Sequence, residues 1–308
     1  MSTGIGTGLR TTTIIVAFGV GIAAVLATVM AFFGSTWWLF DWFANFRWQL
    51  MWLSIICTVA YYLAARGIAA VVFLIAVVVN AWLIAPLWLG SQPKGTGEDG
   101  TRVVAVDLYG GADDSDAVFQ WLDRANADII IAAGVASDRL DSLIGEGSDF
   151  RVLHRPAADT AGIAVVATAD YAVEVAATPT LGDPILTVTV PSGSGTIDII
   201  TSWGPLATSS ERFDALDERL ATITKAVGNA PDEVMVIGSL GATRFASGMR
   251  SLMGETGLRD ATEGEGYLST WPVSDFPIIG GWLGAPLDIV LMSDGITPFA
   301  FSAGPDIG

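Results

Sequence analysis

The stretch Glu233–Arg244, which reads EVMVIGSLGATR, decides how the second part of the chain folds. Val234 to Ile237 is a short apolar run, long enough for one buried β-strand. Gly238 and Gly241 follow it closely and predict a tight turn into a polar loop. The stretch therefore predicts a strand of a buried sheet with a glycine-containing loop at its carboxyl end.

Apolar and charged residues are unevenly distributed along the chain. Of the 308 residues, 52% are hydrophobic, and the mean hydropathy of +0.54 is too high for an ordinary soluble protein. Residues 1–90 hold three arginines and one acid, Asp41. Subtracting these from 15 basic and 32 acidic residues leaves 12 and 31 for residues 91–308, a net charge of −19. So acidic a surface repels phosphate backbones and excludes nucleic acid as a partner; it fits a saline habitat or a basic docking partner.

Three apolar runs in the first 90 residues have the length of a membrane span. They are Ile14–Phe33, Trp48–Ala65 and Gly67–Leu89. Each is long enough to cross the roughly 30 Å hydrocarbon core of a bilayer as a helix. The two later runs argue against a cleaved signal peptide. We therefore predict an N-terminal region of three transmembrane helices that contacts the lipid bilayer.

The charges beside these runs predict an orientation. Arg10 and Arg66 lie on one side of the membrane, and Arg47 with Asp41 lies on the other. The positive-inside rule then places the N-terminus in the cytoplasm and everything after Leu89 outside it. The predicted location is the cytoplasmic (inner) membrane, as a multi-pass protein with its C-terminal domain on the periplasmic, extracytoplasmic side.

An aromatic segment, Trp37–Trp48, joins the first two runs. One interpretation is an interfacial belt, because tryptophan favours the headgroup region of a bilayer. The other is a docking surface for a further membrane protein, because aromatic residues dominate interface hot spots. The candidate contacts of that surface are Trp37, Trp38, Trp42 and Phe46. In the third run, Asn80 is expected to make a helix–helix hydrogen bond worth about 1 kcal/mol.

Composition divides the chain into three parts. Residues 1–90 form the membrane anchor, and residues 91–100 (SQPKGTGEDG) have the composition of a flexible linker. In residues 101–308, strand-like runs alternate with helices that have one apolar face. Such a pattern implies sheets covered by helices, in an α/β or α+β domain.

Nine strands and three helices are predicted in that domain. The strands are Arg102–Leu108, Ile129–Ala133, Gly162–Ala167, Ala172–Ala177, Ile185–Val190, Thr196–Ser202, Val234–Ile237, Leu287–Met292 and Pro298–Ser302. The four between Gly162 and Ser202 have hairpin-like spacing. The helices are Asp116–Ala127, Thr208–Gly228 and Phe245–Thr256. The first should turn Val118 and Leu122 inward, and the second should begin with a capping box, Thr208-x-x-Glu211.

The loop Gly238-Ser239-Leu240-Gly241-Ala242-Thr243 resembles the Gly-Asp-Phe-Asn-Ala-Thr motif of the endonuclease/exonuclease/phosphatase superfamily. The resemblance covers nearly all of residues 101–308. A subgroup of the superfamily carries three N-terminal membrane helices, similar to the layout of this chain. The resemblance implies a four-layer α/β/β/α sandwich of two packed sheets.

The resemblance also implies a catalytic site, and its working side chains are replaced in this chain. The Asp and Asn of the loop, which hold the nucleophilic water and the phosphate, are Ser239 and Gly241. The Glu that is the principal Mg²⁺ ligand is Gly134, and a glycine offers that ion nothing. The His that contacts the scissile phosphate is Trp203, in the sequence Thr201-Ser202-Trp203-Gly204-Pro205. We expect a pseudoenzyme without metal, cofactor or catalytic residues.

Two acids remain at positions where the resemblance implies function. Asp107, in Val106-Asp107-Leu108, stands where the family has an Asn, and Leu287-Asp288-Ile289 stands for its Ile-Asp-His, so that Ile289 replaces the histidine. We interpret both acids as structural hydrogen-bonding groups at strand ends, because two carboxylates without the Glu make a poor Mg²⁺ site. The only histidine, His154, is interpreted as a loop residue.

The Pro- and Gly-broken segment Trp271–Leu283 is too irregular for a strand or a helix. It is either a lid packed over the domain's own core or an exposed apolar patch that contacts the membrane or a partner. Its candidate contacts are Trp271, Phe276 and Trp282.

Together these features predict a non-catalytic, membrane-anchored accessory or scaffold subunit. It would dock on or stabilise a larger integral membrane protein complex, such as a respiratory or photosynthetic one, because anchor and domain offer two binding surfaces. The alternative is a metal-dependent phosphodiesterase or phosphatase that acts on lipid or sugar phosphates at the outer face of the membrane through Asp107 and Asp288. A third option, a non-catalytic binder of lipid head groups, is disfavoured by the apolar Trp203.

Overall fold

The computed structural model describes residues 2–65, 67–95, 100–109, 115–144, 149–157, 160–169, 171–180, 183–192, 195–271, 280–302 and 304. The predictions that concern Arg66, Phe276 and residues 96–99 therefore lie outside the described residues.

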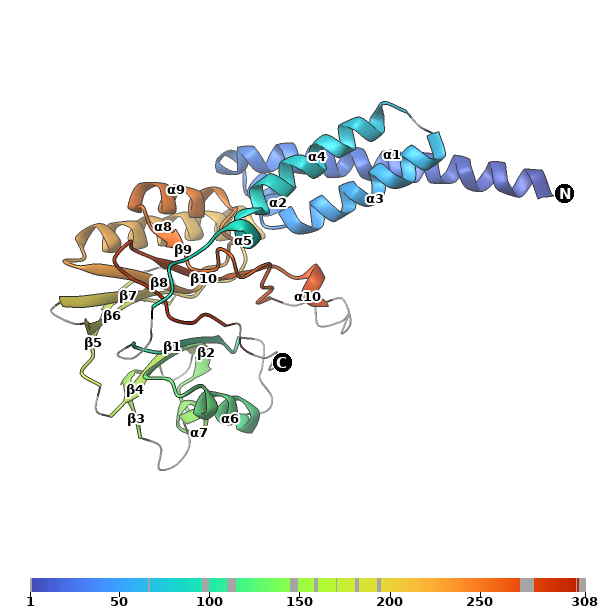
Figure 1. Cartoon of the computed structure of the whole chain (residues 1–308). Coiled ribbons are helices and arrows are strands. Elements are labelled where there is room, and N and C mark those ends of the chain that lie inside the picture. Colours follow the sequence, from blue (N-terminus) through green and yellow to red (C-terminus); the bar gives the residue numbers. More distant parts are fainter. Residues whose placement is uncertain are drawn as a thin grey trace.

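The anchor is a set of apolar helices that projects from the domain (Figure 1). Its elements are α1 (Ser2–Met30), the 3₁₀ helix η1 (Ala31–Thr36), α2 (Trp38–Ala44), α3 (Arg47–Ala65), α4 (Ala69–Ile84) and α5 (Pro86–Leu89). Two stretches, Thr11–Thr36 and Arg47–Ala65, are long and apolar enough to cross a membrane by length and composition. The predicted third span is divided before Pro86, and α4 has only 16 residues. Of the three predicted spans, two therefore meet this test.

Polar side chains join the anchor helices to one another. Asn80 of α4 is fully buried and donates through Nδ2 to Thr28 Oγ1 of α1 at 2.9 Å. Arg47 of α3, also buried, donates through Nη1 to the Thr28 carbonyl at 3.1 Å. The predicted helix–helix hydrogen bond of Asn80 is confirmed, and it links helices from opposite ends of the anchor sequence.

The domain contains two β-sheets. The four-stranded sheet has the order β1-β2-β4-β3, and the six-stranded sheet has the order β5-β6-β7-β8-β10-β9. The strands of the first are β1 (Val103–Asp107), β2 (Ile129–Ala136), β3 (Phe150–His154) and β4 (Ala161–Thr168). Those of the second are β5 (Glu174–Thr178), β6 (Ile185–Ser192), β7 (Gly195–Thr201), β8 (Glu233–Ser239), β9 (Arg259–Asp260) and β10 (Asp288–Met292). β2 and β4 are buried along most of their length, which explains their continuous apolar sequences.

Helices cover the outer face of each sheet (Figure 1). The helices α8 (Ser210–Asn229) and α9 (Ser247–Thr256) lie on the six-stranded sheet, and α6 (Ser115–Ala125) and α7 (Leu140–Ile144) lie on the four-stranded sheet. Three buried clusters correspond to these layers. Ile223 of α8 belongs to the first, Val118 of α6 to the second, and Val188 of β6 to the third, which lies between the sheets. The order helix, sheet, sheet, helix is the predicted four-layer α/β/β/α sandwich.

Several local predictions differ from the structure. The cap of α8 is Ser209, whose Oγ accepts from the Arg212 amide at 3.3 Å, and not Thr208 of the predicted capping box. The four strands predicted at hairpin-like spacing are divided between the two sheets after β4. The predicted strand Pro298–Ser302 forms no strand, because its residues find no pairing partner among the described strands. His154 lies in β3, opposite Val165, and not in a loop.

The start of the predicted flexible linker is fixed to the domain. Gln92 Nε2 donates to the Asp260 carbonyl at 3.1 Å, and Gln92 Oε1 accepts from Arg259 Nη1 at 2.7 Å. The Gly95 amide donates to the Pro298 carbonyl at 3.0 Å. Residues 91–95 therefore connect anchor and domain as an ordered strap, despite a composition typical of flexible linkers.

Candidate functional site

The positions that the resemblance singles out lie together where the two sheets meet. Asp107 ends β1 and is opposite Ala133 of β2, one residue before Gly134. In the other sheet, Ser239 of β8 is opposite Asp288 of β10, with Ile289 beside it. Trp203 follows β7 and bridges the two sheets, since its Nε1 donates to Asp107 Oδ2 at 2.9 Å. We call the space around Asp107, Gly134, Trp203, Gly241 and Asp288 the cleft.

Asp107 is held by two donors. Besides the Trp203 indole, the backbone amide of Tyr109 donates to Asp107 Oδ1 at 2.9 Å. The rings of Tyr109 and Trp203 pack against each other with centroids 4.3 Å apart. Both oxygens of the Asp107 carboxylate thus accept a hydrogen bond, and two packed aromatic rings lie beside the carboxylate.

Gly134 has a backbone that only glycine adopts easily. Its φ is +72°, and it lies within an irregularity of the β2–β4 pairing between Ala132 and Val135. A Cβ built on Gly134 would lie 2.4 Å from the Tyr109 amide nitrogen and 2.6 Å from the Tyr109 Cα. Backbone atoms therefore occupy the space that a glutamate side chain would need, and the residue cannot carry a carboxylate without a shift of the chain.

Gly241 is enclosed in the same way. Its φ is +78°, and a Cβ at this position would lie 2.3 Å from the Pro205 carbonyl oxygen and 2.7 Å from that of Gly204. At Gly238, with φ +147°, a Cβ would lie 2.4 Å from the carbonyl oxygen of Ser202. The segment after Trp203 thus packs directly on the backbone of the loop after β8.

Asp288 is a carboxyl group of the cleft with a raised pKa. Burial, and after it the nearby Asp107 carboxylate, raises the pKa of Asp288 to about 6, although hydrogen bonds from the Ser239 and Thr270 hydroxyls oppose the shift. The Asp288 amide itself donates to Thr270 Oγ1 at 2.9 Å. Asp288 and Asp107 therefore interact electrostatically across the two sheets.

The cleft does not fit the magnesium ion that the resemblance implies. Mg²⁺ requires carboxylate oxygens and several waters in a near-octahedral arrangement. Asp107 already accepts two hydrogen bonds, and Gly134 stands at the position of the principal Mg²⁺ ligand that the resemblance implies. Across the described part of the chain, no three His, Cys, Asp or Glu side chains form a group that could hold a metal ion.

The aromatic segment Trp37–Trp48, predicted as a membrane belt or a partner surface, also forms an interface within this chain. Asp41 Oδ1 accepts from the Ser247 amide at 2.6 Å, and Asn45 Oδ1 accepts from the Thr243 amide at 2.7 Å. Trp38 packs against the core beneath α8 and α9. We call these contacts, together with those of Gln49 below, the anchor–domain interface.

The described end of the segment Trp271–Leu283 completes this interface. Gln49 Nε2 of α3 donates to the carbonyls of Leu283 and Gly284 at 3.0 and 2.5 Å. The Trp282 ring, on α10 (Gly280–Leu283), lies 6.0 Å from that of Trp52. Of the predicted partner contacts, Trp37, Trp271 and Trp282 remain 47%, 45% and 39% exposed. The described part of the segment thus contacts the anchor of its own chain and still presents aromatic surface.

Sequence reasoning missed Asn45 and Gln49, and it missed the role of Asp41. One signal was present, because Asp41 is the single acid among residues 1–90 and an acid in an apolar region is costly without a partner. The partner itself, the first turn of α9, is 206 positions away in sequence. Ala246, the N-cap residue of α9, has no polar side chain that could cap the helix. The Asp41 carboxylate of the anchor accepts the hydrogen bond from the first turn instead.

No protein-family model matches the chain, and no curated protein matches it. Among solved structures, it is similar to a humanised D. rerio TDP2 with 14 mutations, at 12% identity and a TM-score of 0.47, over 64% of this chain and 86% of that one. A truncated Caenorhabditis elegans TDP2 matches at 15% identity and a TM-score of 0.49, over 64% and 85% of the two chains. An endonuclease/exonuclease/phosphatase from Beutenbergia cavernae DSM 12333 matches at 14% identity and a TM-score of 0.48, over 63% and 64%. The resemblance stated from the sequence is confirmed for the fold, since two packed sheets between helical layers are the architecture that it implies.

Proposed function

We propose that this chain is a non-catalytic accessory protein, anchored in a membrane, that docks on or stabilises a larger integral membrane protein complex. The observation that carries the proposal is the crowding of the cleft by backbone atoms. Cβ atoms at Gly134 and Gly241 would lie 2.4 and 2.3 Å from backbone atoms of Tyr109 and Pro205. A site that retained metal chemistry would need side-chain oxygens in those directions.

The anchor–domain interface supports the same role. Buried polar groups of the anchor, Asp41 and Asn45, are each hydrogen-bonded to a backbone amide of the domain. Such contacts hold the domain in one orientation relative to the anchor. A domain fixed in this way offers a partner two surfaces with a defined geometry, so that modest contacts on each add up to stable attachment.

The contact surface that we assign to the partner consists of exposed aromatic side chains beside this interface. Trp37, Trp271 and Trp282 are the candidates with the largest exposure, and Trp42 and Phe46 are half-buried. Tryptophan is enriched at the energetically important centres of protein interfaces. We place the domain on the extracytoplasmic face of the cytoplasmic membrane, where the complex would be respiratory or photosynthetic.

Copurification tests the docking role. The full chain is solubilised from its native membrane in a mild detergent, and the proteins that migrate with it are identified. We expect one large complex to copurify with the native chain and to be lost with the double variant Trp37→Ala/Trp282→Ala. The matched control, Tyr109→Ala, removes an exposed aromatic ring of the cleft and should leave the complex intact. Retention of the complex by the double variant, or its absence from the native chain, would contradict the assignment.

A second candidate function, hydrolysis of lipid or sugar phosphates, is favoured by one observation. Asp288 has a pKa of about 6 beside a second carboxylate, Asp107, and such a value suits a general acid or base near neutral pH. A phosphodiesterase assay with bis-p-nitrophenyl phosphate in Mg²⁺ or Mn²⁺ separates the two proposals. Turnover that Asp107→Ala or Asp288→Ala abolishes would favour the enzyme, whereas the accessory role predicts none.

A further inference from the structure

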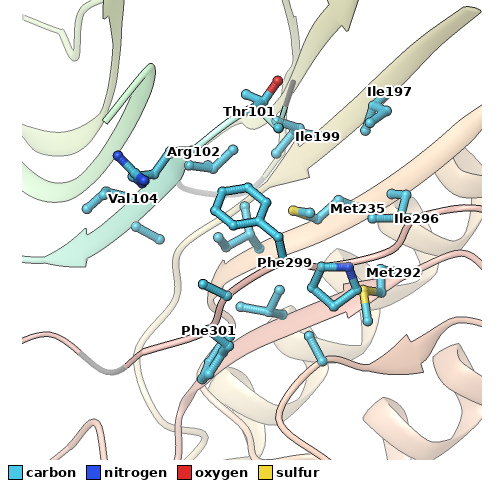
Figure 2. Close-up of a pocket in the computed structure, with 18 of the residues that line it drawn as sticks. Thr101, Arg102, Val104, Ile197, Ile199, Met235, Met292, Ile296, Phe299 and Phe301 are labelled. Atoms are coloured by element: carbon cyan, nitrogen blue, oxygen red, sulfur yellow. The ribbon is translucent and has the colours of Figure 1, made fainter. Parts of the chain in front are cut away.

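The chain's own C-terminal segment borders a cavity of about 920 Å³ between the two sheets. Figure 2 shows Ile296, Phe299 and Phe301 of this segment among the side chains that line the cavity. The Phe299 ring centroid lies 6.0 Å from the guanidinium carbon of Arg102, which also lines it. This cavity therefore lies among segments of the domain itself, whereas a second, smaller pocket lies where the anchor meets the domain.

The second pocket has a volume of about 430 Å³ and is lined mainly by aromatic rings. Trp48 of α3 and Trp88 of α5 line it from the anchor, and Tyr267 and Trp282 line it from the domain. The Trp48 ring stacks on those of Trp88 and Tyr267, with centroids 5.2 and 5.0 Å apart. The Trp282 ring lies 6.5 Å from that of Trp48, at an angle of 71°. We call this site, whose volume is in the range of small-ligand sites, the aromatic pocket.

The aromatic pocket lies at the domain end of a candidate membrane span. Trp48 is in the first turn of α3, which is long and apolar enough to cross a bilayer. Trp88 belongs to α5, the last helix before the strap that leads into the domain. In a membrane-spanning anchor, this position corresponds to the headgroup region, where tryptophan is enriched.

Buried polar atoms without a hydrogen-bond partner gather at this pocket. Nine such side-chain atoms occur among the described residues, and four of them belong to Trp48, Gln49, Trp52 and Ser269. Trp48 and Ser269 line the pocket, and the Trp52 ring lies 5.7 Å from that of Trp48. Three of the four atoms are donors, namely two indole N–H groups and a hydroxyl. A membrane belt would leave such groups exposed to water and headgroups, so their burial favours a ligand rich in acceptor oxygens.

The charge of the lining restricts the ligand further. All residues that line the pocket are uncharged, and the domain is strongly acidic. An anionic headgroup would therefore find no cation to pair with and would be repelled. Aromatic faces attract ammonium groups, and the cation–π contacts of the described residues lie elsewhere, at Phe32 and Phe299. A ligand that carries both acceptor oxygens and an ammonium group fits the donors and the rings together.

We propose that the aromatic pocket binds the headgroup of a zwitterionic phospholipid, whose phosphodiester carries an amine or a quaternary ammonium group. The phosphodiester oxygens accept hydrogen bonds from the Trp48 indole and the Ser269 hydroxyl, and the ammonium group lies against the rings of Trp88 or Trp282. The bound lipid fastens the domain to the bilayer at a point beside the anchor helices. The inference rests on the membrane anchoring of the proposed function but not on its docking role.

Lipid retention tests the proposal. The full chain in a nonionic detergent is equilibrated with equal amounts of phosphatidylcholine, phosphatidylethanolamine and phosphatidylglycerol, and the lipid that coelutes on gel filtration is identified by mass spectrometry. We expect the two zwitterionic lipids to be enriched over phosphatidylglycerol by roughly fivefold, the order expected of a cation–π contact. Lipid retained in the proportions supplied would overturn the inference.

Two variants test the assigned residues without touching the pair substituted in the docking test. Trp88→Leu removes a ring of the pocket, and Ser269→Ala removes a hydroxyl that has no partner, so that the lipid-free chain should lose no stability from it. Each should return the retained lipid toward the proportions supplied. Trp82→Leu, which removes an exposed indole of α4 outside the pocket, is the matched control and should preserve the enrichment. Equal losses in Trp88→Leu and Trp82→Leu would assign the selection to a general aromatic belt and overturn the proposal.

A water-soluble headgroup separates the two possible sources of this chemistry. Phosphatidylcholine should stay bound in the presence of glycerophosphocholine at the same concentration, and its displacement would overturn the assignment to a membrane lipid. Loss of the selectivity from a chain that still copurifies with a large complex would refute the inference and leave the docking role in place. Recovery of the native chain outside the membrane fraction would refute both this inference and the proposed anchoring.

Discussion

The loop that follows β8 faces two regions of the molecule, and they differ in what fills them. On one side is the cleft, where Gly241, which has no side chain, packs closely against the Pro205 backbone. On the other is the anchor–domain interface, where backbone amides of Thr243 and Ser247 are bonded by side chains of the anchor. In the cleft, a residue without a side chain allows two backbone segments to pack closely together. In the interface, polar side chains of the anchor accept hydrogen bonds from backbone amides of the domain. The same loop thus packs against backbone on the side of the cleft, and on the side of the anchor its region is hydrogen-bonded to Asp41 and Asn45.

The largest effect that separates the two regions is expected at Gly134. Gly134 and Gly257 both have φ of +72°, but a Cβ at Gly257 meets nothing within 4 Å. Gly257→Ala should therefore cost only the conformational penalty of about 1–2 kcal/mol. Gly134→Ala adds a collision with the Tyr109 backbone, and the total should reach about 4 kcal/mol. Thermal unfolding of the solubilised full chain measures both, and equal losses would mean that the cleft is not closed by backbone contact.

Local patterns explain why most of the fold could be predicted. The apolar run of β2 and the helical spacing of Phe213, Leu216 and Leu220 in α8 are properties of neighbouring residues. The strand β3 was missed because Phe150–His154 lies at the edge of its sheet and mixes polar with apolar residues. Pro298–Ser302 was wrongly predicted as a strand because its composition is strand-like. It has no partner among the described strands, and strand pairing depends on the tertiary structure and not on local sequence.

The candidate site was predictable in position but not in detail. The spacing of the motif-like stretches located Asp107, Gly134, Trp203 and Asp288, because strand ends in packed sheets converge. The approach of the Tyr109 backbone to Gly134 depends on the irregular pairing of β2 with β4, which leaves no local signal. Contacts such as Asp41 with Ser247 join residues 206 positions apart and follow only from the tertiary structure.

Asp288 should give the second-largest effect, and its sign depends on pH. Its pKa is raised in the folded state, from 3.8 to about 6, so the stabilisation that it contributes is fully present below pH 4 and is lost as the pH rises through 6. Asp288→Asn removes this loss. At pH 8 the free energy of unfolding of the variant should exceed that of the native chain by up to about 3 kcal/mol, and near pH 4 the two should differ little. Denaturation from pH 4 to 8 measures this.

The exposed Glu255 provides the control for that experiment. Glu255→Gln changes the same net charge on the outer surface of α9 and should leave the pH profile of stability unchanged. If Glu255→Gln and Asp288→Asn shifted the profile equally, general charge repulsion in this acidic chain, and not the pair of carboxylates in the cleft, would govern its pH dependence.

Breaking the anchor–domain interface should cost less. Asp41→Ala leaves the Ser247 amide at the start of α9 without its acceptor, at a cost of about 2 kcal/mol. The loss is local, so hydrogen exchange of the Thr243 and Ser247 amides should accelerate more than that of β8. Glu218→Ala, an exposed acid on α8, is the matched control and should change neither. Unchanged exchange in Asp41→Ala would show that the domain is held by the apolar contacts alone.

The smallest effect is expected for the substitution Trp203→Phe, which tests the hydrogen bond between Trp203 and Asp107 in the cleft. Trp203→Phe keeps an aromatic ring against Tyr109 but removes the indole donor to Asp107. Because the Tyr109 amide still donates to that carboxylate, the loss should be about 1 kcal/mol. Trp203→Ala, which also removes the packed ring, should cost about 3 kcal/mol or more in the same thermal measurement. If the two variants lost equal stability, the hydrogen bond between the sheets, and not the aromatic filling, would hold the cleft closed, and the contrast with the anchor–domain interface would disappear.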